Sequence, residues 1–496
     1  MAKREQTTFE RLNGKDLNRK QRRELHRQIF SDESGLEILH PDAAGIDIGN
    51  ESHFVSVPPE RDPKPVQEFG SWTADLEKMA EWLKSCGVKT VAMQSTGVYW
   101  FSAHDVLEEH GLEVFVVNAR NTRNLPGRKT DVQESQWLRK LQCAFNSCAD
   151  TYGLLRDSFH PPDEIRAVRT TWRVRDRLVK DASRYVQHMQ KALTTMNVQL
   201  ANVVSDITGV TGQAIIRTIL KGERDIYVLA DLRDPHVKAS REMGFQLLPQ
   251  EIARSLEGNW REDVLFELKQ AVDAYDFVQK QMTECDKRLE KYMAALPSRV
   301  LPGSDTPKQE DGKEKKKRKS KKPKGNHPHF DLKAELHRVN GVDLTTIEGI
   351  DIMIAQTIFS EIGTDVSRFK DEQHFVSWAG LTPNKDVSGG KVIRQSRKRV
   401  NNRVGNALRM AANSLHRSES YLGARFRKLK ARRGAAKTIK GTARYLGCLV
   451  YRVLTHGQEW VDRGAKEFEQ KYRQRQINEL MKKAAELGIP LAVPNA

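Results

Sequence analysis

The pattern of apolar and polar residues changes along the chain, and its first regular part begins at Ala43. From there to about residue 150, short runs rich in β-branched residues alternate with amphipathic segments that end at glycine. Such runs predict strands in AAGIDIG, HFVSVP, KTVAMQ and LEVFVVN, and helices in TADLEKMAEWLKSCG and FSAHDVLEEHG. Opening strands followed by alternating helices and strands predict an α/β domain with a mixed sheet over residues 41–150.

Residues 151–300 follow a different period. Apolar residues recur there at alternating steps of three and four, the heptad spacing of a coiled coil, and only Arg175 interrupts the first series. The spacing predicts long helices that pair as an antiparallel stalk or between subunits, and a compact bundle explains it equally well. The two series are Ile165, Val168, Trp172, Val179, Ala182, Val186, Met189, Leu193, Met196 and Leu200, and Val264, Leu268, Ala271, Tyr275, Val278, Met282, Cys285, Leu289 and Tyr292.

The remaining segments divide into polar and helical parts. Residues 1–40 are polar and basic, which predicts a partly disordered arm. Residues 301–330 are dense in Lys and poor in apolar residues, which predicts a disordered linker that acts mainly as a solvated spacer. Residues 331–496 return to a helical pattern, so we expect a mainly α-helical C-terminal domain.

One stretch of that C-terminal domain, LTTIEGIDIMIAQTIFSEIG, resembles a helix-hairpin-helix motif. Gly349 falls in its turn, and Ala355, Ile358 and Ile362 fall on one helical face. Such hairpins present backbone amides to phosphates. Asp351 at the tip suits a phosphate less well than the glycine usually found there.

Composition narrows the possible partners. The chain has 496 residues, a formal charge of +18 and a pI near 9.6, so its field attracts polyanions, and nucleic acid is the expected partner class. The mean hydropathy of -0.64, the lack of long apolar runs and the polar N-terminus argue against membrane binding and secretion, so we expect a cytoplasmic protein. Five scattered cysteines predict free thiols and no zinc site.

Three carboxylates of the first domain are candidate metal ligands. Asp47 ends the first predicted strand, and Asp131 and Glu134 lie three residues apart at the start of a predicted helix, on one helical face. This set suits a magnesium site on an RNase H-like sheet, because Mg²⁺ prefers hard oxygen ligands and leaves room for phosphate oxygens. The alternative is structural, since acidic residues in a first helical turn also favour the helix dipole.

A second candidate lies far downstream, in VSGGKVIRQSRKRVNNRVGNA. Ser388 precedes two glycines that would let a DNA backbone approach closely, and a basic run follows that could neutralise a scissile phosphate. A serine needs activation to act as a nucleophile, and the nearest preceding histidine, His374, has no sequence signal that marks it as a base. A plain turn before a solvated basic segment is the alternative reading.

The chain closely resembles the DEDD transposases of the insertion sequence 110 family, 1111-like branch. The resemblance rests on GIDIGNESHFVSV, VAMQSTGVYW, VNARNTRNLPGRKTDVQESQWL, FVSWAGLTPNKDVSGGK and RVGNALRMAANSL, which occur in the family's order. It implies a RuvC-like (RNase H-like) N-terminal domain, an antiparallel coiled-coil middle and a C-terminal transposase domain with a catalytic serine. It also implies magnesium, a dimer or tetramer, DNA partners at the element ends and target, and guidance by a non-coding bridge RNA.

Carried over by position, the four acidic positions of the family fall on Asp47, Gln94, Asp131 and Glu134. Gln94 replaces a Glu and removes one charge, and Glu134 replaces an Asp and lengthens the side chain by one methylene. Ser388 matches the serine expected to form a phosphoserine link to DNA. The expected nucleic-acid contacts are Lys391, Arg394, Arg397, Lys398, Arg399, Arg403, Arg128 and Lys129.

Two other functions fit the same residues. A metal-dependent, junction-resolving nuclease would use the acidic site without Ser388. A non-catalytic RNA- and DNA-binding relative would have lost activity through the change at Gln94. A covalent protein–DNA adduct separates the recombinase from both, because only the recombinase uses a serine nucleophile.

Overall fold

A computed structural model describes residues 41–95, 97–117, 130–143, 159–234, 249–300, 325–388, 391–397 and 402–457, with single positions between 470 and 486. The chain divides into two compact units, Met1–His160 with Lys385–Arg394 and Pro161–Asn384 with Gln395–Ala496. The predicted arm and most of the Lys-rich linker lie outside the described residues. The domain limits given by the sequence therefore stay predictions.

The N-terminal unit is built on a five-stranded mixed sheet of order β3-β2-β1-β4-β5. Central β1 (Ala43–Ile48) runs parallel to β4 (Thr90–Gln94), and β4 runs parallel to β5 (Glu113–Val117). On the other side, β2 (Ser52–Ser56) and β3 (Val66–Gly70) are antiparallel. This is the predicted mixed α/β architecture, and it is compatible with an RNase H-like fold.

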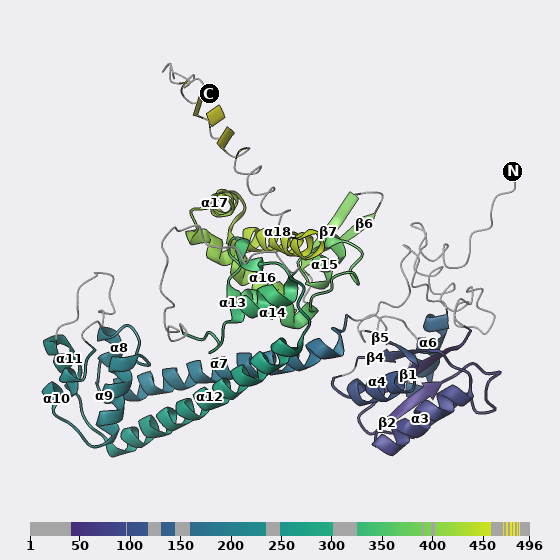
Figure 1. Ribbon diagram of the computed structural model, residues 1–496, viewed down its shortest axis with the longest axis horizontal. Coiled ribbons are helices and arrows are strands. Elements are labelled where there is room, and N and C mark those ends of the chain that lie inside the picture. Colours follow the sequence, from purple (N-terminus) through teal and green to yellow (C-terminus); the bar gives the residue numbers. More distant parts are fainter. Residues whose placement is uncertain are drawn as a thin grey trace. The chain divides into compact units, whose positions relative to one another are not determined.

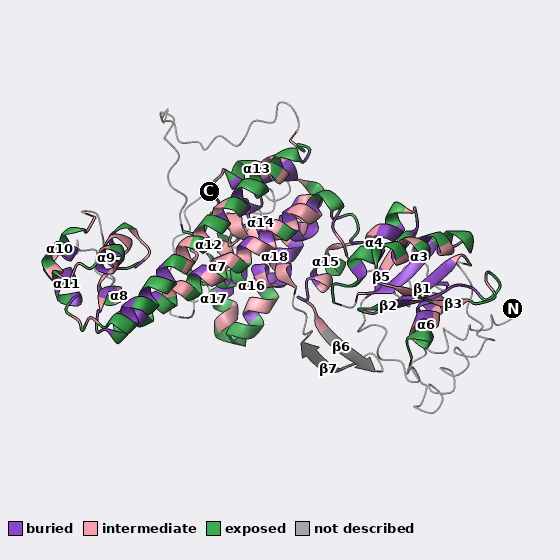
Figure 2. Ribbon diagram, turned by 90° about the horizontal axis from the view of Figure 1, so that it is seen from below, coloured by how far each residue is buried: buried purple, intermediate pink, exposed green. Residues whose placement is uncertain are grey.

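Helices cover both faces of this sheet. Figure 2 shows α3 (Thr73–Ser85) and α4 (Trp100–Glu109) on one face and α6 (Asp131–Cys143) on the other. Because side chains alternate along a strand, Ile46 and Ile48 of β1 enter the core under α3 and α4. The alternate residues of the same strand, Gly45 and Asp47, face α6. The main core of this unit includes Ile46, Ile48, Val55, Leu76, Leu83, Met93 and Leu107.

Gly45 lets α6 lie directly on β1. A Cβ built at Gly45 would come within 2.2 Å of the backbone nitrogen of Arg139 and 2.3 Å of the carbonyl oxygen of Ser135. Any side chain at this position would push the helix away from the strand. The absence of a side chain at Gly45 therefore sets how close the middle of α6, around Ser135 to Arg139, comes to β1.

The second unit contains two long helices, α7 (Asp163–Thr195) and α12 (Glu262–Ala295), that lie side by side (Figure 1). They run antiparallel, since Lys191 near the end of α7 pairs with Glu267 near the start of α12. At one end they share an apolar core with the short helices α8 (Leu200–Val203), α9 (Val210–Leu220), α10 (Ile226–Asp231) and α11 (Pro249–Ser255). The antiparallel pair agrees with the predicted stalk, whereas coiled-coil packing stays a prediction.

Arg175, which interrupts the first heptad series, is buried rather than exposed. Its guanidinium donates to the carboxylate of Asp286 on α12 over 2.5 Å, and both side chains are 2% exposed. Asp286 also accepts from the backbone nitrogen of His329 at 3.2 Å. The interruption is therefore a buried ion pair that fixes the register of α7 against α12.

The C-terminal part is mainly helical, with one two-stranded sheet. In the described residues no helix is both long and apolar enough to cross a membrane. The elements are α13 (Leu332–Asn340), η1 (Leu344–Thr346), α14 (Ile352–Ile362), α15 (Glu372–Trp378), β6 (Pro383–Ser388), β7 (Lys391–Arg397), α16 (Arg403–Ser414), η2 (Leu415–Arg417), α17 (Tyr421–Arg433) and α18 (Ala435–His456).

The stretch that resembles a helix-hairpin-helix, residues 344–363, forms the 3-10 turn η1, a loop and α14, so its first part is a single short turn and not an α-helix. Gly349 in the turn has a φ of +88°, and Ala355, Ile358 and Ile362 are buried on one face, as their spacing predicted. Asp351 is the N-cap of α14 and accepts a hydrogen bond from the backbone nitrogen of Ile354 at 2.8 Å. The aspartate at the tip thus satisfies a backbone N–H group of this helix end with its own side chain.

Candidate active site

The ends of the parallel strands β1 and β4 bring two of the expected residues to one edge of the sheet. Asp47 precedes the last residue of β1, and Gln94 is the last residue of β4. Gly45 pairs with Ala92 across these strands, so Asp47 and Gln94 share the face that α6 covers. The small residues Gly45 and Ala92 precede Asp47 and Gln94 on this face, and they leave room for α6 to pack against the sheet.

The first turn of α6 supplies the other two. The backbone nitrogen of Gln133 donates to the hydroxyl of Thr130 at 3.3 Å, so TDVQ caps the helix at Thr130. Asp131 is then the first residue of α6, and Glu134 follows one turn later on the same side. The capping sequence fixes where the helix begins, and so it fixes where both carboxylates project.

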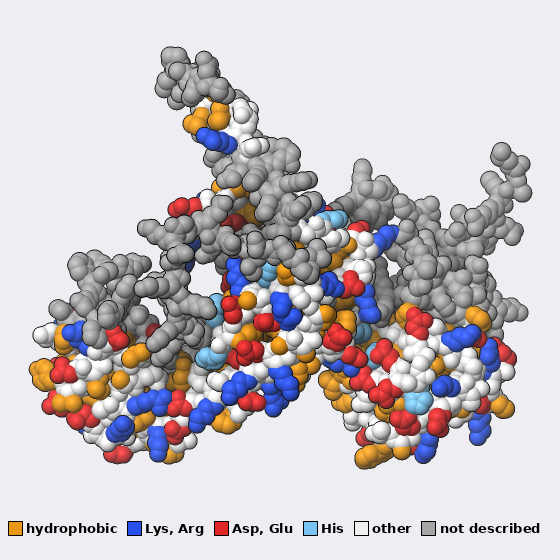
Figure 3. All heavy atoms as spheres, in the orientation of Figure 1, with side chains coloured by type: hydrophobic (Ala, Val, Ile, Leu, Met, Phe, Trp, Pro, Cys, Tyr) orange, Lys and Arg blue, Asp and Glu red, His pale blue; other side chains and the backbone are white. Residues whose placement is uncertain are grey.

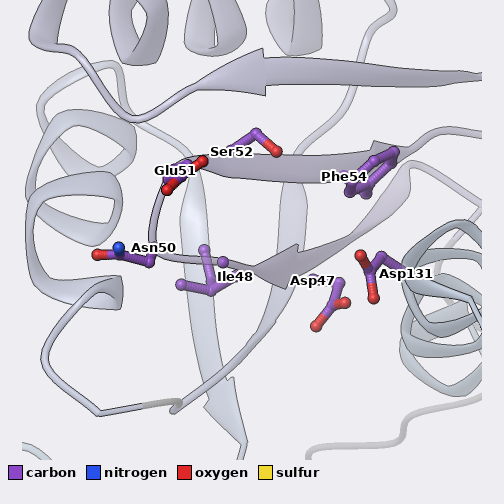
Figure 4. Close-up of a pocket in the computed structure, with 8 residues that line it drawn as sticks. Asp47, Ile48, Asn50, Glu51, Ser52, Phe54 and Asp131 are labelled. Atoms are coloured by element: carbon purple, nitrogen blue, oxygen red, sulfur yellow. The ribbon is translucent and has the colours of Figure 1, made fainter.

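A pocket of about 320 Å³ opens beside these residues. Figure 4 shows the carboxylates of Asp47 and Asp131 lying side by side, with Phe54 of the neighbouring strand close by and Glu51 at the far end. The described lining contains three carboxylates and neither Lys nor Arg. Three carboxylates in one pocket whose described lining holds no Lys or Arg favour binding of a cation. The lining residues are Asp47, Ile48, Gly49, Asn50, Glu51, Ser52, Phe54 and Asp131.

Gln94 and Glu134, the two positions that depart from the family pattern, contact each other. The amide nitrogen of Gln94 donates to a carboxylate oxygen of Glu134 at 3.2 Å, and Gln94 is only 4% exposed. Two carboxylates at these positions would repel each other, whereas an amide and a carboxylate attract. The two departures from the family pattern are therefore complementary, because the amide of Gln94 and the carboxylate of Glu134 form a hydrogen bond.

Two separate regions of the chain match family models of known proteins. Residues 44–198 match the DEDD_Tnp_IS110 family model, described as transposase, and residues 343–427 match the model described as transposase IS116/IS110/IS902 family. The chain belongs to the IS110 family of transposases. It is therefore a DNA transposase, as the motifs predicted. A search of curated proteins found no match.

DEDD transposases typically use a divalent metal ion, and the residues that line the pocket decide whether such an ion fits there. Mg²⁺ is usually held by one or two carboxylates together with substrate phosphates and water. Asp47 and Asp131 provide such a pair in a pocket wide enough for a phosphate. Among the described residues no group of three or more His, Cys, Asp or Glu side chains is arranged to hold a metal ion. The fit thus rests on two carboxylates, with Glu134 turned to Gln94.

Ser388 is the last residue of β6, and β7 begins at Lys391. Ser388 therefore lies at the end of a strand that pairs with β7. Arg394 and Arg397 lie on β7, while Lys398, Arg399, Arg128 and Lys129 fall outside the described residues, as do Gly389 and Gly390.

Two further residues singled out by the sequence have local partners. Arg403, expected to contact nucleic acid, donates to Asp176 of α7 at 2.9 Å and lies 3.8 Å from Glu361 of α14. Its charge thus also stabilises the packing of α16 on α7 and α14. His374 lies on α15, and its ring nitrogen Nδ1 is 2.8 Å from the carboxylate of Asp371, the N-cap of that helix.

The sequence reading missed the role of Gly45 and the contribution of the β1–β2 turn. A glycine inside an otherwise β-branched strand signals close approach of another backbone, so AAGIDI held a usable sign. The lining residues Asn50, Glu51 and Phe54 carried no comparable signal, because they join Asp47 only through the pairing of β1 with β2.

Proposed function

We propose that this transposase cuts and rejoins DNA through a covalent link between Ser388 and a DNA phosphate, with Mg²⁺ held at the acidic pocket. The observation that carries the proposal is the pocket beside Asp47 and Asp131, which combines carboxylates with the absence of a basic residue in its described lining. The resemblance around Ser388 supplies the nucleophile. Both halves of the site must meet at one phosphate, within one chain or between subunits.

The reaction balances without an external energy source. The hydroxyl oxygen of Ser388 forms a new bond to phosphorus, the bond from phosphorus to one DNA oxygen breaks, and the released DNA hydroxyl receives a proton. Attack by another DNA hydroxyl on the phosphoserine reverses these steps and restores the serine. Bound magnesium would supply charge stabilisation for the pentacoordinate phosphate. Asp47 and Asp131 would hold the ion, and Gln94 would hold Glu134 in place.

The partners of the reaction extend this proposal. DNA binding follows from the family, and we propose that a bridge RNA encoded by the element pairs with the element end and the target. We also propose that two or four subunits assemble through the α7–α12 helices. The formal charge of +18 supports binding of long polyanions by the whole chain but does not distinguish RNA from DNA.

The test for the nucleophile is Ser388→Ala, with Ser396→Ala on β7 as the matched control. Both variants lose one hydroxyl from the same hairpin, and both keep its length and charge. The covalent adduct with labelled DNA should disappear from a denaturing gel only for Ser388→Ala, and recombination should fall by orders of magnitude. An adduct that persists in Ser388→Ala would show that another residue attacks the phosphate.

The same gel addresses the competing functions. A junction-resolving nuclease would release cut DNA with no adduct in the wild-type protein, and it would keep cutting after Ser388→Ala. The RNA partner needs a separate measurement, namely sequencing of nucleic acid that co-purifies with the full chain. A discrete RNA species supports the bridge, while random cellular RNA in its place would contradict it.

A further inference from the structure

Helices α17 and α18 of the second unit carry Lys and Arg but no acidic side chain. Residues 421–457, which span α17 and α18, contain ten Lys and Arg and no Asp or Glu. By contrast, both basic and acidic side chains lie along α7 and α12 (Figure 3). A solvated helix face normally mixes both signs, so a stretch of this length with one sign needs a reason.

Some of the ten cations make contacts that hold the helices together. Arg452 pairs with Glu372, Arg444 donates to Gln373, and Arg427 donates to the carbonyl oxygens that end η2. Arg425 lies over the ring of Tyr445, 4.7 Å from its centroid. These contacts join α17 and α18 to each other and to α15 and η2.

The cations around the α17–α18 connection have no such role. Arg432, Arg433 and Lys437 are exposed, and in the described part of the chain no carboxylate forms an ion pair with any of them. Arg432 and Arg433 suit the negative end of α17, but Lys437 lies in the first turn of α18, where the helix dipole disfavours a cation. Helix stability therefore explains part of the cluster and not the whole.

Gly441 gives an independent indication on the same side of α18. It lies in the helix interior one turn after Lys437, is exposed, and has no atom within 4 Å of the place where a Cβ would be. Glycine is a poor helix former, and no neighbour requires its absence of a side chain here. A bare stretch of helix beside exposed cations is suited to close approach of a phosphate backbone.

We propose that this basic hairpin, defined by Arg432, Arg433, Lys437 and Gly441, binds the sugar–phosphate backbone of duplex DNA without reading its sequence. DNA is the substrate class of the family, and the surface complements its charge. No described aromatic side chain of α17 or α18 is strongly exposed, so the hairpin lacks the stacking platform that single strands need.

The decisive variant is Arg432→Gln, Arg433→Gln, Lys437→Gln, compared with Lys280→Gln, Lys287→Gln, Lys291→Gln on α12. Both triple variants remove three exposed charges, so they lower the net charge equally. Binding of the full chain to a short DNA duplex, freed of bound nucleic acid beforehand, is measured over a series of salt concentrations. The hairpin variant should bind at least about tenfold more weakly at low salt, and its logarithmic salt slope should shrink by about 2.7 units.

The control variant should keep most of the wild-type slope, because its lysines lie on a face of mixed charge. Equal losses in both variants would mean that net charge alone acts, and the proposal would be wrong. If binding to an RNA duplex falls while binding to the DNA duplex is unchanged, the hairpin serves RNA and the proposal is overturned. Unchanged thermal unfolding in both variants shows that folding is not the cause.

A second pair of variants tests the close approach at Gly441. Gly441→Ala and Gly441→Gln both raise helix propensity, so both should raise the melting temperature. Only the long side chain of Gly441→Gln should obstruct the DNA backbone, and we expect its affinity to fall about fivefold or more below that of Gly441→Ala. Equal affinity in the two variants would remove Gly441 from the binding surface.

Discussion

Carboxylates serve opposite purposes in the two units of this transposase. In the helical unit, Asp286 lies buried against Arg175, and Glu361 accepts from Arg169 and Arg173 at 2.6 to 3.0 Å. In the sheet unit, Asp131 lies beside Asp47 in a pocket whose described lining has no basic residue. The carboxylates with arginine partners join helices to one another, whereas the carboxylates gathered in the pocket form a surface that suits a cation.

Two carboxylates of the helical unit that pair with basic side chains, Asp176 and Glu372, have lowered pKa values. Burial acts to raise the pKa of Asp176, but hydrogen bonds from Lys180 and Arg403 outweigh it and hold that pKa below its usual range. A hydrogen bond from Arg452 likewise lowers the pKa of Glu372. Paired carboxylates of this kind stay charged in the fold and contribute to its stability above pH 4 or so.

Asp131→Ala gives the largest expected effect and tests the functional side of the comparison. It should reduce strand cleavage about a thousandfold or more, because loss of one ligand removes about 4 kcal/mol or more of transition-state stabilisation. Stability should hardly change, since the substitution removes a charge from a cluster of like charges. The measurement is single-turnover cleavage of labelled DNA beside thermal unfolding, with Glu51→Ala in the same pocket as the control. Full cleavage by Asp131→Ala would exclude the metal role.

Asp286→Ala tests the structural side. Removal of one partner leaves Arg175 buried and uncompensated, so unfolding free energy should fall by about 3–5 kcal/mol. The matched control is Asp276→Ala, which breaks the exposed pair with Arg217 and should cost at most about 1 kcal/mol. Denaturant unfolding measures both.

A double variant distinguishes the ion pair from simple packing. Arg175→Met with Asp286→Leu fills the same space with apolar side chains, and it should recover most of the stability lost by Asp286→Ala. The double variant should not be as unstable as Asp286→Ala if the loss in the single variant comes from an uncompensated buried charge. Equal instability of the two variants would show that this explanation of the structural carboxylates is wrong.

Local signals predicted β1, β2, β4 and β5 and the helices between them, but they predicted neither β3 nor the β6–β7 hairpin, and they did not identify contacts between residues distant in sequence. The runs AAGIDIG and KTVAMQ predicted β1 and β4, and Asp131 and Glu134 were placed at the start of a predicted helix that the structure shows as α6, because strand and helix periods act over a few residues. The partner of Arg175 lies 111 residues away, so the heptad pattern showed an interruption and not its cause.

The acidic site shows the same limit. Asp131 and Glu134 could be placed on one helical face from their spacing, whereas their association with Asp47 came from the resemblance to a family. The contact of Gln94 with Glu134 spans forty residues and depends on β4 lying next to β1 beneath α6. No sequence period reports such a contact, although the two departures from the family pattern were visible together.

Gln94→Glu gives the smallest expected effect and sharpens the comparison within the site itself. A carboxylate at position 94 would face Glu134 at the present 3.2 Å amide distance, and like charges so close raise the cost of ionising both. With magnesium in excess the ion can offset this repulsion, so maximal cleavage should stay within about tenfold of wild type.

At limiting magnesium the effect of Gln94→Glu depends on where the side chain of Glu134 lies. If Glu134 turns away from position 94 to reach the ion, the variant should need less magnesium, because a ligand is gained. If Glu134 keeps its place, repulsion should raise the requirement. Gln94→Met removes the hydrogen bond without adding charge and serves as the control. A magnesium titration of cleavage that is the same for wild type, Gln94→Glu and Gln94→Met would show that this pair does not hold Glu134 for the reaction and belongs to the structural carboxylates.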